Sequence, residues 1–161
     1  MKKAANTSKA KPQPKAITNR RAHYDYALGD EFVVGLHLSG PEVRAARDGH
    51  IQLKGAFVTI KQDELWLTNA SFSVKHNEPG GHNERAVDTS PRKLLAHRKE
   101  IDKLTAARKE GMTIVPLKLL NQGRFIKLII ALGKGKKRYD KREALKKRDF
   151  ARESALLRKR G

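Results

Sequence analysis

The stretch MTIVPLKLLNQGRFIKLIIAL, residues 112–132, decides the fold class of this chain. It contains two apolar runs, 112–120 and 124–132, on either side of Asn121-Gln122-Gly123. Asn and Gly are favoured in tight turns, so the stretch predicts a β-hairpin. Pro116 lacks a backbone N–H for the strand ladder and is therefore expected to mark a sheet edge or a bulge.

Further apolar runs upstream extend the β pattern. Residues 31–38 contain Gly35 and residues 51–60 contain Gly55, and a glycine inside a strand indicates a bulge or a sharp bend. Lys61-Gln62-Asp63-Glu64 is typical of a hairpin turn and leads into a run over 65–74. Several short strands of this kind favour a small OB-like antiparallel β-barrel, closed or partly open, which is a common nucleic-acid-binding fold. We expect its core to contain Phe32, Val34, Leu36, Leu38, Phe57, Val58, Leu65, Leu67, Leu94, Leu104, Ile114, Leu117, Leu119, Leu128 and Ile130.

Two helices are expected to interrupt the strands. A short one is predicted over residues 42–48. A longer one is predicted over 90–111, because its apolar residues recur at helical spacing. Ser90 would be its N-cap, Pro91 suits the first helical position and Gly111 suits the C-cap. The expected fold class is therefore mostly β with α (α+β), with helices flanking the barrel.

The charge of the 161-residue chain is concentrated at its two ends. The formal net charge is +19, of which residues 1–21 carry +7 and residues 134–161 carry +9. A charge of this size indicates a polyanionic partner, with nucleic acid as the first candidate and an anionic membrane surface as the second. We therefore divide the chain into a disordered basic N-terminal arm (1–18), an OB-like RNA-binding barrel (19–133) and a basic C-terminal tail (134–161). Tails that serve only solubility are the alternative interpretation.

Several classes of function lack the residues they need. The chain has no cysteine, which excludes disulfides and thiolate zinc sites. Its histidines are scattered, no Ser-His-Asp pattern occurs, and the glycines at 133 and 135 do not form a Walker A loop. We expect no catalytic residues, no metal and no cofactor. Without a secretory signal or an apolar run near the ~20 residues of a membrane span, a cytoplasmic protein is expected.

The basic tail has helix-forming residues from 139 to 160 and no proline, but only a weak apolar stripe. We expect it to be disordered alone and helical against a charged partner. Tyr139 lies in its densest basic run, where an aromatic ring can stack on an unpaired base. Packing of Tyr139 back onto the barrel is the alternative.

The predicted long helix begins with two cations, Arg92 and Lys93. Because helix N-termini favour anions, we expect both side chains to contact phosphates. His97 would lie one turn further along the same helix. It is interpreted either as an RNA contact or as an exposed polar position.

A set of short motifs runs from residue 19 to about residue 150. In chain order they are Asn19-Arg20-Arg21-Ala22, Gly35-x-x-Leu38-x-Gly40-x-Glu42-Val43-Arg44, Arg92-Lys93-Leu94-Leu95-x-His97-x-x-Glu100-Ile101, Pro116-Leu117-Lys118-Leu119, Gly135-Lys136-Lys137-x-x-Asp140-Lys141-Arg142 and Lys146-x-Arg148-Asp149. Each motif alone is modest, whereas the ordered set is specific and resembles that of the SmpB (SsrA-binding protein) family.

The resemblance implies a role in ribosome rescue. Proteins of this family bind the tRNA-like domain of transfer-messenger RNA, support its aminoacylation and enter the ribosomal A site with EF-Tu, which acts through the aminoacylated RNA. In the family, the C-terminal tail becomes helical in the empty mRNA channel, and the resemblance implies the same for this chain. The expected partners are thus transfer-messenger RNA, small-subunit rRNA and, indirectly, EF-Tu, with no membrane and a monomeric free protein.

The site residues fall into two groups, one expected on each kind of RNA. The expected contacts with transfer-messenger RNA are Arg20, Arg21, Arg44, Arg92, Lys93, Leu95 and His97. The expected tail contacts at the decoding centre are Lys134, Lys136, Lys137, Tyr139, Lys141, Arg142, Lys146 and Arg148.

Three positions depart from the family pattern. Val33 stands where the family usually has an acidic residue, Ser90 where an arginine is common, and Ala96 where a leucine is usual. These departures indicate a divergent lineage with adjusted RNA contacts. Two other classes of function stay open from the sequence: a structural ribosomal protein, which would have no preferred free RNA, and an RNA-processing enzyme, which would show turnover.

Overall fold

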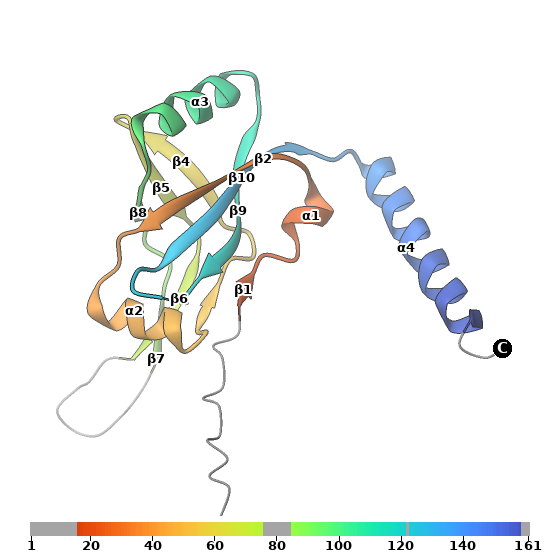
Figure 1. The fold of residues 1–161 in the computed structure, drawn as a ribbon, viewed down its shortest axis with the longest axis horizontal. Coiled ribbons are helices and arrows are strands. Elements are labelled where there is room, and N and C mark those ends of the chain that lie inside the picture. The colour runs from red at the N-terminus through yellow and green to blue at the C-terminus, as the bar shows by residue number, and fades with distance from the viewer. Residues whose placement is uncertain (1–15, 76–84, 122, 159–161) are drawn as a thin grey trace, which may run out of the picture.

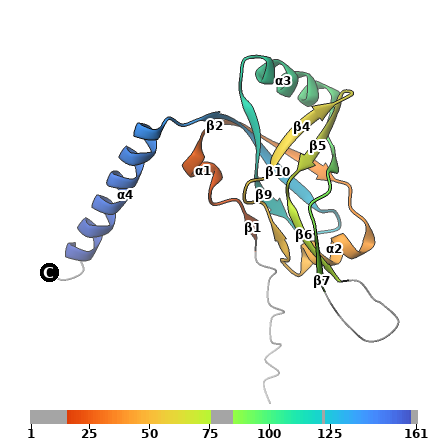
Figure 2. The ribbon, with the colours of Figure 1, turned by 180° about the vertical axis from the view of Figure 1, so that it is seen from behind.

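The computed structural model describes residues 16–75, 85–121 and 123–158, and shows a ring of strands with helices around it (Figures 1 and 2). The strands are β1 (Ile17–Thr18), β2 (Tyr26–Leu36), β3 (Ile51–Gln52), β4 (Phe57–Lys61), β5 (Glu64–Thr68), β6 (Ser71–Lys75), β7 (Arg85–Asp88), β8 (Arg92–Leu95), β9 (Thr113–Leu120) and β10 (Lys127–Gly135). The helices are α1 (Ala22–Asp25), α2 (Gly40–Arg47), α3 (Arg98–Lys109) and α4 (Arg138–Arg158).

The main sheet closes on itself. Its strands follow the order β1-β9-β10-β2-β8-β5-β4, and an additional pairing of β4 with β9 completes the ring. A second sheet of three strands, β3-β6-β7, lies beside it. Large side chains fill the interior, including the fully buried Leu65, Leu67, Phe72, Leu104, Leu119, Leu128 and Ile130. The predicted α+β class, mostly β with flanking helices, is confirmed in the form of this strand ring.

The hairpin predicted over 112–132 is confirmed as β9 and β10, but β10 starts at Lys127 instead of Arg124 and runs to Gly135, into the segment assigned to the tail. The two strands pair from Lys127↔Leu120 to Gly133↔Thr113. The register shifts between Ile129, which faces Lys118, and Ile130, which faces Pro116. Because β9 also pairs with β1 and β4, it is not an edge strand, and Pro116 is accommodated by this irregularity in the ladder.

The two runs expected upstream are wrong as continuous strands. The bend expected at Gly55 is confirmed as a break, whereas the break at Asn69 was not expected. Residues 51–60 divide into β3 and β4 around Gly55, whose φ is +77°. Residues 65–74 divide into β5 and β6 around Asn69, whose φ is +61°. A left-handed residue cannot continue a strand. At both breaks the chain passes between the ring and the three-stranded sheet.

The short helix is confirmed, and the long one is wrong in its first third. Helix α2 begins after Ser39, which forms a capping box with Glu42. Residues 92–95, expected to be helical, form β8, which pairs with β2 on one side and β5 on the other. Helix α3 therefore starts only at Arg98 and ends before Gly111, whose φ is +84°. Sheet pairing on both sides of β8 overrides the helical spacing of its apolar residues.

The predicted core is largely correct. Phe57 is the clear error, because it is 39% exposed on β4. Phe32 and Leu38 pack against the core and are only partly buried. The buried residues Leu53, Phe72 and Val115 were not in the predicted set.

The two chain ends behave differently. The folded body begins at residue 17 and not at 19, because buried Ile17 pairs with Leu119. Residues 1–15 of the expected disordered arm lie outside the described residues. At the other end the tail is helical, as α4, and projects away from the ring (Figures 1 and 2). That it becomes helical only on a partner stays a prediction. No helix in the described part of the chain is long and apolar enough to cross a membrane.

Candidate nucleic-acid interface

Strand β8 divides its residues between the inside and the outside of the ring. Arg92 and Leu94 are buried, whereas Leu95 is exposed and Lys93 is partly exposed. Leu95 pairs with Gly35 of β2, which in turn pairs with Lys127 of β10. Paired residues point to the same face of a sheet, so Leu95 and Lys127 share the outer face.

Gly35 allows the close approach of β8. A Cβ atom at residue 35 would lie 3.1 Å from the Cβ of Leu95, tighter than ordinary contact. The sharp bend predicted at Gly35 is not observed, because β2 continues through this residue. Glycine instead serves here as a small residue beside β8. Val33, Gly35, Leu95, His97 and Lys127 are among the residues that line a shallow surface hollow here. We call the outer face formed by Val33, Lys93, Leu95, His97 and Lys127 the β8 surface.

His97 is exposed and lies where the strand passes into the helix. It is the N-cap of α3, and its backbone N–H donates to Glu100 Oε2 at 2.9 Å. The expectation that His97 lies inside a helix is wrong, since the helix begins one residue later. Its side chain nevertheless stands at the end of the β8 surface, on the same hollow as Leu95.

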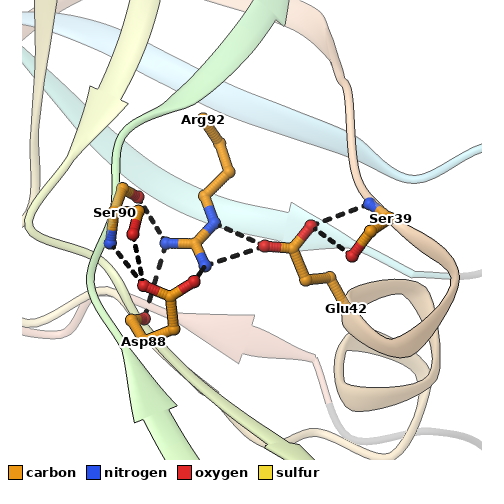
Figure 3. A network of polar contacts seen from close by, with 5 residues as sticks. All are labelled: Ser39, Glu42, Asp88, Ser90 and Arg92. Carbon is orange, nitrogen blue, oxygen red and sulfur yellow. Dashed lines mark hydrogen bonds and ion pairs between the residues drawn. The ribbon is translucent and has the colours of Figure 1, made fainter.

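Arg92 is held inside the protein by two carboxylates (Figure 3). Its side chain is 4% exposed, and its Nη2 lies 2.7 Å from both Glu42 Oε1 and Asp88 Oδ2. Nη1 donates to the carbonyl oxygens of Asp88 and Ser90. The guanidinium carbon lies 4.0 Å from the centroid of the Phe72 ring.

The two carboxyl groups of this network remain charged to unusually low pH. Burial acts to raise the pKa of Glu42, but hydrogen bonds from the Ser39 backbone N–H and from Arg92 outweigh it and lower the pKa. The pKa of Asp88 is lowered by hydrogen bonds from the hydroxyl and the backbone N–H of Ser90, and by the charge of Arg92. The network thus ties α2 to the segment that leads into β8.

This geometry corrects the expected role of Arg92. There is no helix N-terminus at residue 92, and the guanidinium already has its partners inside the protein. It is therefore not available to a phosphate in this structure. Lys93 differs, because its side chain is 39% exposed and pairs at the surface with Glu64. Exposed ion pairs are weak, so a phosphate can replace Glu64 as the partner of Lys93.

The remaining body residues lie away from the β8 surface. Arg20 is exposed, and Arg21 forms an ion pair with Asp25 within α1, with 3.1 Å between Nε and Oδ2. Arg44 lies on α2 and lines a groove that also contains Lys75 and Arg85. The seven expected contacts with transfer-messenger RNA are thus not one cluster.

The base of the tail is fastened to α1. The Lys136 backbone N–H donates to the Asp25 carbonyl at 2.9 Å, and Lys136 Nζ donates to the His23 carbonyl at 2.8 Å. Lys141 Nζ lies 3.0 Å from Asp25 Oδ1. The hydrogen bond from Lys141 lowers the pKa of Asp25. Lys136 and Lys141, expected on ribosomal RNA, are therefore engaged at α1 in this structure.

The other expected tail residues face outward. They are Lys134, Lys137, Tyr139, Arg142, Lys146 and Arg148, all of them exposed. The ring of Tyr139 is 60% exposed, with Lys137 Nζ 6.0 Å from its centroid. Packing of Tyr139 back onto the strand ring is therefore not observed.

The sequence reasoning missed Lys127 and Phe125, which are both exposed at the start of β10. Residues 125–128 alternate between exposed and buried in the order Phe125, Ile126, Lys127, Leu128. Lys127 is the first residue of β10 and lies on its outer face, whereas Phe125 is exposed in the bend before that strand. The run was assigned to a strand, but its outward residues were not considered as a surface.

A strand ring with a cationic, partly apolar outer face and a projecting basic helix defines the class of small basic RNA-binding proteins. The family model for "SmpB protein" matches residues 16–160 of this chain. The chain therefore belongs to the SmpB family.

Relatives and a solved structure extend this match. The SsrA-binding protein of Afipia carboxidovorans is 44% identical over 158 residues, which cover 95% of this chain and 98% of the relative. The SsrA-binding protein of Bacillus pumilus is 43% identical over 136 residues, covering 84% of this chain and 85% of the relative. A solved structure reported as "tmRNA-SmpB: a journey to the center of the bacterial ribosome" has a TM-score of 0.57 and 32% identity, and covers 81% of this chain and 94% of its own.

Proposed function

We propose that this protein binds the tRNA-like domain of transfer-messenger RNA and delivers that RNA to the A site of stalled ribosomes. The observation that carries the proposal is the similarity to SsrA-binding proteins over nearly the whole chain, tail included. The protein would act as a monomeric cytoplasmic adaptor without catalytic activity of its own. EF-Tu would join indirectly, through the aminoacylated RNA.

On the body of the protein, the β8 surface is the proposed contact with transfer-messenger RNA. Leu95 offers an exposed apolar side chain next to the exposed imidazole of His97 and the cations Lys93 and Lys127. Apolar contact with a sugar or base, flanked by cations for phosphates, suits a folded RNA better than generic duplex binding. Arg20, Arg21 and Arg44 would contact other parts of the same RNA. Arg92 would act by holding β8 in place.

The tail is the proposed contact with the ribosome. In this proposal α4 lies in the empty mRNA channel, with Tyr139 stacking in the decoding centre. The outward cations of the tail would meet small-subunit rRNA. Lys136 and Lys141 would exchange their α1 partners for phosphates when the tail docks.

The experiment that tests the proposal is competitive binding at physiological salt. The labelled tRNA-like domain of transfer-messenger RNA is challenged with unlabelled tRNA and with unrelated duplex RNA. We expect only the cognate domain to compete well. Equal competition by all three RNAs would mean that charge alone explains the binding, and the structural ribosomal protein would then be the better interpretation. RNA that is cut during the incubation would support an enzyme.

A further inference from the structure

Phe125 is the most exposed aromatic side chain of the strand-rich body in the described residues, at 67%. Its neighbours are held firmly. Ile126, next in the chain, is buried in the core, and its carbonyl accepts a hydrogen bond from the Leu36 backbone N–H at 3.3 Å. The exposed position of Phe125 is thus set by an anchored backbone.

The β9–β10 connection, which carries Phe125, is also bonded to helix α2. Arg47 Nη2 donates to the carbonyl oxygens of Gly123 at 3.1 Å and Arg124 at 3.4 Å. Buried Asn121 donates from Nδ2 to the Ala46 carbonyl at 3.1 Å. In Figure 1 the β9–β10 connection lies beside α2, as these bonds require. A large apolar ring is therefore presented to solvent by a loop that is bonded on both sides.

The chemistry around the ring is cationic. The guanidinium carbon of Arg124 lies 5.4 Å from the Phe125 ring centroid, a cation–π contact that orients the ring. Phe125 lies in the bend that precedes β10, two residues before Lys127, the first residue of that strand, and both side chains are exposed. Lys127 belongs to the β8 surface. Phe125 and Arg124 thus lie next in the chain to one end of that surface, and Arg47 of α2 bonds to the same bend.

We propose that Phe125 and Arg124 form a stacking platform for an unpaired RNA base, with Arg124 also meeting the adjoining phosphate. An aromatic ring on a rigid support, bordered by cations, is the arrangement with which proteins bind unstacked nucleotides. This inference rests on the proposed function and adds a second contact to the RNA held at the β8 surface.

The test is equilibrium binding of the full-length protein to the tRNA-like domain, with four variants. Phe125→Ala removes the ring, Phe125→Leu keeps an apolar side chain without aromaticity, and Phe125→Tyr keeps the ring. Val87→Ala is the matched control, because Val87 is 66% exposed on β7. We expect Phe125→Ala and Phe125→Leu to bind about tenfold more weakly, and Phe125→Tyr and Val87→Ala to bind as the wild type does.

The salt dependence of binding and the melting temperature distinguish base stacking from a loss of charge or of stability. The Phe125 variants should leave the salt dependence of binding unchanged, whereas Arg124→Ala should reduce its log–log slope by about 0.7–0.9. Melting temperatures should match the wild type, since the exposed ring contributes little to the core. Wild-type affinity in Phe125→Ala would overturn the platform, and wild-type affinity in Phe125→Leu alone would overturn stacking in favour of a simple apolar contact.

The outcome can be separated from that of the proposed function. If the wild type prefers the tRNA-like domain but Phe125→Ala binds equally well, only the platform fails. If the wild type binds all RNAs alike, the proposed function fails. In that case the same variants, measured against an unstructured single-stranded oligonucleotide, still decide whether Phe125 stacks on bases.

Discussion

At the scale of single residues, the neighbours Arg92 and Lys93 show what a strand does to a pair of like charges. In a helix both would reach the surface, as the sequence suggested. In β8 they point in opposite directions, so Lys93 is partly exposed and Arg92 enters an ion-pair network with Glu42 and Asp88. Alternation over only four residues is too short to outweigh the helical spacing of the apolar residues. The ion-pair partners of Arg92 could not be predicted either, because Glu42 is far away in the sequence and Asp88 lies across a bend.

The first prediction concerns the stability that this network supplies. Arg92→Ala leaves Glu42, 14% exposed, without its cation. Removing one partner of a buried ion pair costs about 3–5 kcal/mol of unfolding free energy. We expect a decrease of that size in urea denaturation. Lys93→Ala is the control and should cost less than about 1 kcal/mol, because its pair with Glu64 is at the surface. Equal decreases in the two variants would contradict the assignment of Arg92 as structural.

The second prediction concerns the pH dependence of stability. The pKa values of Glu42, Asp88 and Asp25 are all lowered in the folded protein. A carboxyl group whose pKa is lowered by folding contributes stability above its unfolded pKa of about 4. That contribution disappears as the pH falls through the folded value. The unfolding free energy should therefore be steady near neutrality and decline in acid.

Glu42→Gln tests the contribution of Glu42, the least exposed of these three carboxyl groups, to the acid sensitivity. The variant cannot carry the charge, so it should be less stable than the wild type at neutral pH and should lose less stability on acidification. Chemical denaturation at several pH values measures both. A parallel decline in the two proteins would mean that Glu42 does not contribute to the acid sensitivity.

At the scale of elements, local signals predicted the hairpins well and the strand breaks poorly. The turn at Gln62-Asp63 and the β9–β10 hairpin join neighbouring segments, so their residues carry the signal themselves. The glycine predicted a bend at Gly55, but no local signal showed that the chain moves between two sheets at Gly55 and Asn69, because that depends on distant strands. Strand β8 was mistaken for helix for the same reason.

The third prediction belongs to helix α4. Tyr139→Ala should leave affinity for the tRNA-like domain nearly unchanged, because Tyr139 lies on the tail beyond the strand ring. It should impair tagging of stalled peptides in a reconstituted translation system, since the variant has no ring for the proposed decoding-centre contact. Tyr139→Phe is the control that keeps the ring. Normal tagging by the alanine variant would remove Tyr139 from the site.

The fourth prediction concerns the junction between α1 and α4. Asp25→Asn removes the carboxylate that binds Lys141 and also pairs with Arg21. The first turn of α4 should then exchange its backbone amides with solvent faster, while the amides of β9 and β10 keep their protection. Hydrogen exchange resolved by residue measures this. Unchanged protection at the base of α4 would show that the backbone bond of Lys136 to Asp25 is sufficient to hold it.

At the scale of the whole molecule, composition indicated a polyanionic partner and placed most of the charge at the two chain ends. It could not predict which cations are free, because that depends on pairing. Arg92 is neutralised inside the body, whereas Lys134, Lys137, Arg142, Lys146 and Arg148 on the tail are exposed. Exposed cations attract any polyanion. Under the proposed function, selectivity for one RNA would therefore come from the body, where charge is combined with the shape of the β8 surface.

The fifth prediction follows from the proposal that the tail attracts any polyanion and the body selects one RNA. A variant that ends at Lys137 lacks residues 138–161, which carry a net charge of +6. The strand ring should still fold, because the described bonds between the removed helix and the body are confined to its first turn at α1. Its affinity for unrelated duplex RNA should fall, with the log–log salt slope reduced by about 0.9 for each phosphate that the shortened protein no longer neutralises.

Affinity of the same variant for the tRNA-like domain should fall less, since the β8 surface is intact. The ratio of the two affinities should therefore rise above that of the full-length protein, even though tagging on ribosomes is abolished. Parallel titrations of both RNAs over a range of salt concentrations measure this ratio. A ratio that falls on truncation would place the selectivity in the tail, and the strand ring would then be only a scaffold that carries it.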